Sequence, residues 1–225
     1  MSIKASAARE KVAAARQSDL RVYLTLRELQ PQFAAYMGTP TRARGYAPLA
    51  GQHALIIEVA PGLMIERVID LALKTDPDLE PGILFVERQF GILEIHGDDE
   101  AKLLRAGQAI LDGLNLKAED QLKPRILFTD VIEDIADQHA VIINRNRQAS
   151  MILPGQCLLV CEMVPALFAT IAANEAEKAA PELTLVDVQM IGAAGRIYMS
   201  GKTADVLKGR DAMEKTLSAI TGREV

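Results

Sequence analysis

Two short apolar runs flank a charged segment in the first half of the chain. Residues 83–86 form the first run and residues 92–95 the second, with glycines at positions 82, 91 and 97. Apolar, β-prone runs separated by a short polar segment are typical of a β-hairpin. We therefore predict a hairpin with its tip at residues 87–91, where a carboxylate, a guanidinium, an amide and a phenyl ring follow one another.

Other segments around this hairpin also show regular hydrophobic patterns. The pattern predicts strands at 21–26 and 53–59, a short helix at 32–37 and a loop at 38–48. Apolar residues at helical spacing predict one apolar helix face: Ile65, Val68, Ile69, Ala72 and Leu73. Asp98 and Asp99 are suited to cap a further helix that ends near Leu114. The first half thus reads as β-α-β-α-β-β-α.

The second half of the chain repeats the first. At a shift of 104 residues, Arg21 aligns with Arg125, Gly51-Gln52 with Gly155-Gln156, and Pro61 with Pro165. Because one register without gaps matches turn glycines and prolines over the whole span, it indicates two copies of one domain. We expect a flexible N-terminal tail at 1–18, copy 1 at 19–122 and copy 2 at 123–225. Each copy should be α+β, with helices packed on one sheet.

Composition narrows the classes of function. Of 225 residues, 49% are hydrophobic, whereas aromatic residues are only 4% and tryptophan is absent, so the core must be aliphatic. A net charge of −5 disfavours a nucleic-acid partner. The apolar runs are too short for a membrane span, and two cysteines suggest a reducing compartment. We expect a cytoplasmic protein without a membrane partner.

The sequence shows little that favours catalysis. His53, His96 and His139 lie in different predicted elements, with no cysteine or carboxylate at metal-ligand spacing, so we expect no metal and no catalytic residue. Two alternatives stay open. One is a ligand-binding regulator whose loop at 192–196 holds a small anion. The other is an enzyme built around Glu58, Glu94 and Arg88, which would need an acid–base pair with perturbed pKa values.

The tips of the two predicted hairpins differ in chemistry. The first tip is charged and long, with Glu87, Arg88, Gln89, Phe90 and Gly91. The second tip is small and mostly backbone, with Ile191, Gly192, Ala193, Ala194 and Gly195. Two tips with the same packing role would be similar, so the difference suggests that they do different jobs. The alternative is that Glu87 and Arg88 form an exposed pair worth under about 1 kcal/mol.

Several motifs together resemble one known family. They are residues 57–62 (IEVAPG), 70–74 (DLALK), 86–94 (VERQFGILE), 143–146 (INRN), 172–180 (AANEAEKAA) and 192–196 (GAAGR). The chain resembles the tandem-domain, trimer-forming shell proteins of bacterial microcompartments over residues 19–221. The order of its elements is similar to that of the circularly permuted branch.

The resemblance implies two tandem ferredoxin-like domains and a homotrimer that acts as a pseudohexameric tile. The tips with Glu87 and Arg88 would alternate with residues 192–195 around a gated pore for small polar metabolites. Lys74 and Lys178 match the lysine at the tile edge. It also implies a place in the microcompartment shell with other shell proteins, and in some relatives two stacked trimers. Since the tips lack cysteine, we expect no iron–sulfur cluster and no other cofactor.

Overall fold

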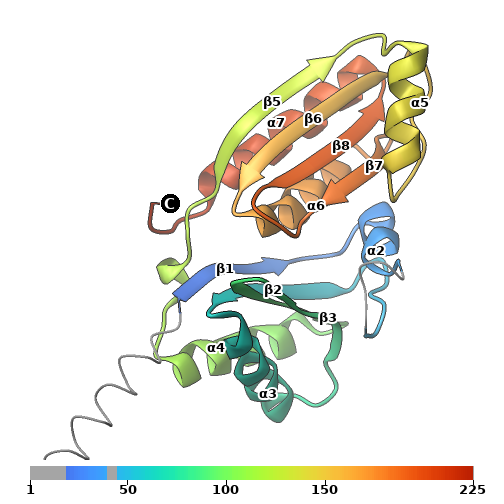
Figure 1. The fold of residues 1–225 in the computed structure, drawn as a ribbon. Coiled ribbons are helices and arrows are strands. Elements are labelled where there is room, and N and C mark those ends of the chain that lie inside the picture. Colours follow the sequence, from blue (N-terminus) through green and yellow to red (C-terminus); the bar gives the residue numbers. More distant parts are fainter. Residues whose placement is uncertain (1–18, 40–44, 225) are drawn as a thin grey trace, which may run out of the picture.

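Two antiparallel sheets of four strands each form the frame of the protein (Figure 1). The structure is a computed structural model that describes residues 19–39 and 45–224, so the predicted tail at 1–18 lies outside the described residues. The first sheet has the strand order β1-β2-β4-β3 and the second has the order β5-β6-β8-β7. The strands are β1 (Asp19–Leu26), β2 (His53–Ala60), β3 (Glu80–Glu87), β4 (Phe90–Gly97), β5 (Arg125–Ile132), β6 (Cys157–Val164), β7 (Thr184–Gln189) and β8 (Gly195–Gly201).

Helices connect these strands in the predicted order. The α-helices are α2 (Pro31–Met37), α3 (Ile65–Thr75), α4 (Glu100–Leu114), α5 (Asp137–Asn146), α6 (Ala169–Ala179) and α7 (Thr203–Ala219). Short 3₁₀ turns are η1 (Gly62–Met64), η2 (Ala118–Asp120) and η3 (Ala166–Phe168). The Asp99 side chain accepts a hydrogen bond from the Ala101 amide at the start of α4, which confirms the predicted cap. None of the helices in the described ranges is long and apolar enough to cross a membrane.

The two faces of the first sheet are covered by different parts of the chain. The inner face carries Leu55, Ile57 and Val59, which pack with apolar residues of α3 and α4. The outer face, the one away from α3 and α4, carries Val22 and Ile56, which share a core with residues of β6, α6 and α7. Copy 1 (β1 to α4) is therefore buried partly against copy 2 (β5 to α7).

The short helix α2 lies between the two copies (Figure 1). Its Phe33, Tyr36 and Met37 are buried in the core shared with copy 2, and the Tyr36 hydroxyl donates to the Val188 carbonyl. At its N-terminus the Glu177 carboxylate accepts from the amides of Gln32 and Phe33, at 2.8 and 2.9 Å. Amides at the start of a helix lack acceptors within the helix, and this carboxylate from copy 2 supplies acceptors for two of them in α2.

The outer face of the second sheet has no comparable cover. Helices α6 and α7 pack on its inner face, whereas α5 covers only one end of the outer face (Figure 1). Phe128 on β5 is 54% exposed, although Val22, at the matching place in copy 1, is fully buried. The same fold therefore leaves copy 2 with an open apolar surface.

The predicted repeat without gaps is wrong for the first strand of each copy. Val22 pairs with Glu58, and Phe128 pairs with Glu162, so these first strands match at a shift of 106. From β2 and β6 onward the shift is 104, as predicted. Copy 1 thus has two extra residues between α2 and β2, and the residue equivalent to Arg21 is Leu127 rather than Arg125.

Candidate functional site

The turn between β3 and β4 exposes two polar side chains. Only Arg88 and Gln89 leave the strand ladder, because Glu87 still pairs with Phe90. Arg88 has a φ of 48°, a left-handed conformation that is uncommon for a residue with a side chain. Its side chain is 92% exposed, and its Nε lies 3.7 Å from Glu87 Oε1. This pair is too exposed and too long to hold the turn in one state.

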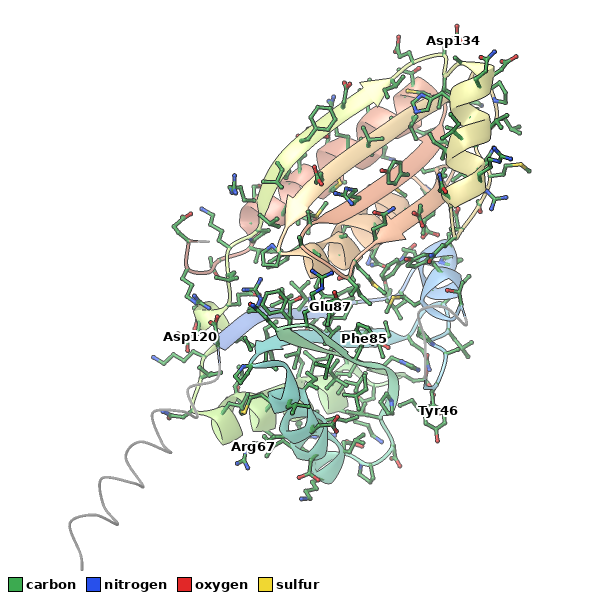
Figure 2. All side chains as sticks on the ribbon, in the orientation of Figure 1. Tyr46, Arg67, Phe85, Glu87, Asp120 and Asp134 are labelled. Carbon is green, nitrogen blue, oxygen red and sulfur yellow. The ribbon has the colours of Figure 1, made fainter. Side chains whose placement is uncertain are left out.

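Glu87 and Phe85 point from the first sheet toward the second copy (Figure 2). Behind the turn, the Phe90 ring is in contact with Arg21 of β1. The Arg21 guanidinium carbon lies 3.7 Å from the centre of the Phe90 ring, and Arg21 Nε donates to Glu58 Oε1 at 2.7 Å. Burial raises the pKa of Glu58, and the Arg21 charge opposes that rise.

The turn between β7 and β8 is longer and carries little charge. Strand β7 ends at Gln189 and β8 begins at Gly195, so five residues form the connection. Gly192 has a φ of 132°, a conformation that only glycine adopts easily. The expectation that the charged tip is the long one is therefore wrong for the backbone, because the turn with Arg88 has only two residues.

Arg196 follows the second turn but is already engaged. It contacts Glu162 at 2.7 Å and donates to Gln189 Oε1 at 3.2 Å. The loop at 192–196 joins two strands, so no helix start faces it. These contacts weaken the hypothesis that the loop holds an anion.

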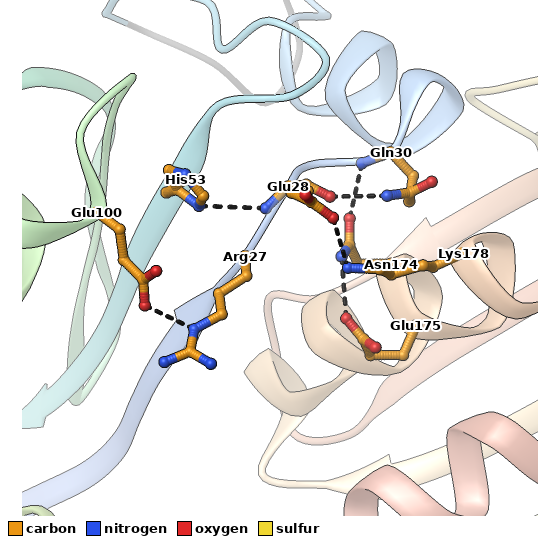
Figure 3. Close-up of polar contacts among 8 residues, drawn as sticks. All are labelled: Arg27, Glu28, Gln30, His53, Glu100, Asn174, Glu175 and Lys178. Atoms are coloured by element: carbon orange, nitrogen blue, oxygen red, sulfur yellow. Dashed lines mark hydrogen bonds and ion pairs between the residues drawn. The ribbon is translucent and has the colours of Figure 1, made fainter.

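The two lysines expected at the tile edge have different partners. Lys74 pairs with Asp70 within α3 at 2.6 Å. Lys178 on α6 pairs with Glu28 of copy 1 at 2.8 Å, beside a bond from the Gln30 amide to Asn174 (Figure 3). This ion pair raises the pKa of Lys178 and lowers that of Glu28.

The structure does not bring together the residues of the enzyme hypothesis. Glu58 pairs with Arg21, Arg88 faces Glu87, and Glu94 lies 2.9 Å from the Nδ1 atom of buried His96. Among the described residues, no cluster of histidine, cysteine or acidic side chains could hold a metal ion. The Glu94–His96 contact escaped sequence reasoning, although their spacing of two on one strand places both on one face.

The sequences and structures of known proteins decide the family. The family model of the CsoS1D N-terminal domain matches residues 20–120. The carboxysome shell protein CcmP of Synechococcus elongatus is 40% identical over 206 residues, which cover 92% of this chain and 95% of that protein. The chain belongs to this family of microcompartment shell proteins.

Solved structures of family members support the same assignment. The double-ringed trimeric shell protein MSM0271 of the RMM microcompartment is 62% identical, with a TM-score of 0.89, over 92% of this chain and all of that one. The fused permuted hexameric shell protein MSM0275 is 46% identical, with a TM-score of 0.86, over 91% and 99%. The predicted tandem permuted fold is confirmed.

Membership of the shell family fixes the general role of the chain. It is a structural component of a microcompartment shell rather than an enzyme, as its relatives are. A shell is built from many subunits, so the chain associates with further shell subunits.

Proposed function

We propose that three chains close into a pseudohexameric tile with a gated opening on the threefold axis. The observation that carries this proposal is the contact between the two copies within one chain. That contact joins the outer face of copy 1 to η3 and α6 of copy 2. The corresponding surfaces at the two far ends of the chain, the outer face of copy 2 and η1 with α3 of copy 1, have no partner in a single chain.

Equivalent residues show this incompleteness directly. Leu167 of η3 is 1% exposed, whereas its equivalent in η1, Leu63, is 75% exposed. On the other surface, Tyr36 of α2 is 1% exposed, whereas its equivalent in α5, Ile142, is 58% exposed. An apolar surface left open at both ends is expected where a second chain repeats the same contact. Each chain supplies two copies of the domain. Three chains joined end to end by this contact therefore make a closed ring of six copies.

In such a ring, six hairpin turns alternate around the axis. Three turns carry Glu87 and Arg88, and three carry the small residues 192–195. Three guanidiniums near one axis repel one another unless they pair with Glu87 or turn outward. Since exposed ion pairs rearrange at little cost, two states of the turn differ by only a few kcal/mol. Polar walls favour small polar metabolites as the solutes that pass.

The edge lysines and the stacking of rings complete the proposal. Lys74 and Lys178 supply contacts between neighbouring tiles, because a long aliphatic stem packs while the ammonium reaches a carbonyl. The 62% identity to a double-ringed trimeric shell protein supports a stacked pair of trimers here as well. We also propose that copy 1 (19–122) and copy 2 (123–225) are the two shell domains, with their boundary at Lys123, between η2 and β5.

Ring closure is tested by placing a charge on the open surface. Leu63→Asp should leave the chain folded, by circular dichroism and thermal unfolding, and should convert trimers to single chains in sedimentation. Leu104→Asp is the matched control, because Leu104 is 46% exposed on α4 and its equivalent on α7, Lys208, is exposed as well, although copy 2 already makes the contact there. Trimers that persist in Leu63→Asp would refute this contact.

The gate is tested separately on the intact ring. Replacing Glu87 and Arg88 together with alanine removes both charged side chains from the turn. We expect the trimer to persist and small polar solutes to cross assembled shells faster. Unchanged passage would argue against a gate at this turn.

A further inference from the structure

Arg21 lies at an irregular point of strand β1. The pairing with β2 shifts between Leu20 and Val22, so Arg21 is the extra residue of a β-bulge. Bulges often redirect a side chain next to a functional site. Here the guanidinium reaches both Glu58 on β2 and the ring of Phe90, the first residue of β4. One side chain thus links the edge strand to the hairpin tip.

The geometry of this contact fixes the ring firmly. Arg21 Nε lies 2.7 Å from Glu58 Oε1, and its guanidinium carbon lies 3.7 Å from the centre of the Phe90 ring. The Glu58 side chain is only 4% exposed and that of Arg21 only 21%. A cation over an aromatic face is held more strongly when water is excluded. Since Glu58 orients the guanidinium, the Phe90 ring is fixed as well.

Copy 2 keeps the ion pair but lacks the aromatic contact. Leu127 occupies the bulge, and Ala194 stands where copy 1 has Phe90. Glu162, the equivalent of Glu58, is paired by Arg196 from β8 instead. Strand pairing therefore does not require an arginine at the bulge. The arginine at the bulge of copy 1 contacts the tip that carries Glu87 and Arg88, whereas Ala194 offers no ring at the equivalent position of copy 2.

We infer that Arg21 is a positioning residue for the opening. It holds Phe90 against the sheet, so that the β4 side of the turn stays fixed and only residues 87–89 rearrange. This inference rests on the proposed function, in which the turn lines an opening. It adds the limit of the movement: Phe90 stays on the sheet in both states, and the charged side chains move.

The test measures the spread of turn positions in the assembled full chain. A nitroxide attached at Gln89→Cys reports distances between chains by pulsed electron resonance, and Cys157 and Cys161 are buried and so protected from labelling. With Arg21→Met we expect the distance distribution to broaden beyond that of the wild type, because residues on the β4 side of the turn then move as well. Phe90→Leu, which leaves the pair with Glu58 in place, should have the same effect. Arg21→Lys keeps a charge over the ring and should return the distribution to the wild-type width.

Arg196→Met is the matched control, because it breaks the equivalent ion pair in copy 2 without touching Phe90. It should leave the distribution as wide as that of the wild type. Hydrogen exchange of the Phe90 and Gly91 amides should also become roughly tenfold faster in Arg21→Met and stay unchanged in Arg196→Met. Equal label distributions and equal exchange rates in the wild type and Arg21→Met would overturn the inference. So would equal broadening by Arg196→Met.

The outcomes also separate this inference from the proposed function. Distances between labels that are too long for three turns around one axis would refute the proposed opening. Exchange at Phe90 would still show whether Arg21 holds the ring in that case. Labels close to one another but unaffected by Arg21→Met would refute only the role of Arg21.

Discussion

The two copies share one strand order but differ in what covers the outer face of the sheet. In copy 1 that face is buried against copy 2, and α2 is completed by Glu177 from copy 2. In copy 2 the face carries exposed Phe128, and α5 exposes Ile142. One chain therefore contains one complete contact between copies. Its two ends carry the two surfaces of that contact, the outer face of copy 2 and η1 with α3 of copy 1, each without its partner. A closed ring of chains buries both of these surfaces.

The hairpin turns differ in the same systematic way. The turn of copy 1 is short, charged and anchored by Arg21, whereas that of copy 2 has five residues and small side chains. A ring of identical copies could not place unlike turns next to one another. Duplication followed by divergence provides that asymmetry within one chain.

The largest expected effect is the difference in lost stability between Tyr36→Ala and Ile142→Ala, the equivalent replacement in copy 2. Tyr36→Ala removes a buried ring and its hydrogen bond to the Val188 carbonyl, so the free energy of unfolding should fall by about 3–5 kcal/mol. Ile142→Ala should cost the dissociated chain under about 1 kcal/mol, because its side chain is mostly exposed there. Denaturant unfolding at low protein concentration measures both. Equal costs would contradict the comparison.

The carboxylate that completes α2 gives the next effect. Glu177→Ala leaves the amides of Gln32 and Phe33 without an acceptor, and we expect a loss of about 1–3 kcal/mol. Copy 1 has Leu73 at the equivalent position, so the contact between chains cannot use this bond. Glu182→Ala, at an exposed site, is the control for removing a charge. If both variants unfold alike, Glu177 does not secure α2.

A smaller, pH-dependent effect is expected at Glu94, where copy 2 has Tyr198. Burial raises the pKa of Glu94 above the ordinary 4.5, so the folded state binds its proton more tightly than the unfolded state does. This carboxyl therefore favours folding at low pH, and that contribution is lost as the pH rises above about 4.5. Glu94→Gln should gain stability relative to the wild type with rising pH. A constant difference from pH 4 to 7 would contradict the raised pKa.

The smallest effect on stability is expected at the two lysines. The Lys74 side chain is 73% exposed and that of Lys178 is 40% exposed, and each makes one surface ion pair, so Lys74→Ala and Lys178→Ala should change the free energy of unfolding by less than about 1 kcal/mol. Both should weaken the growth of flat sheets while the trimer persists. Electron microscopy of the purified variants shows the sheets. Unchanged tiling would remove these residues from the tile edge.

Local patterns in the sequence predicted most elements because their causes are local. Apolar spacing located α3, and Asp99 marked the start of α4. The repeat was found, but its two-residue insertion before β2 was missed, since glycine and proline matches begin only at Gly51. The role of Arg21 could not be predicted, because a bulge arises from the pairing of β1 with β2. The exposure of Leu63 and Ile142, whose equivalents are buried, could not be predicted either, because it depends on the contact between the folded copies.

The mass of the native assembly tests the central claim most directly. The account predicts a particle of three chains of 24.4 kDa, or of six where two rings stack, at micromolar concentration. A particle of one or two chains would contradict it, because neither can cover both open surfaces in a ring.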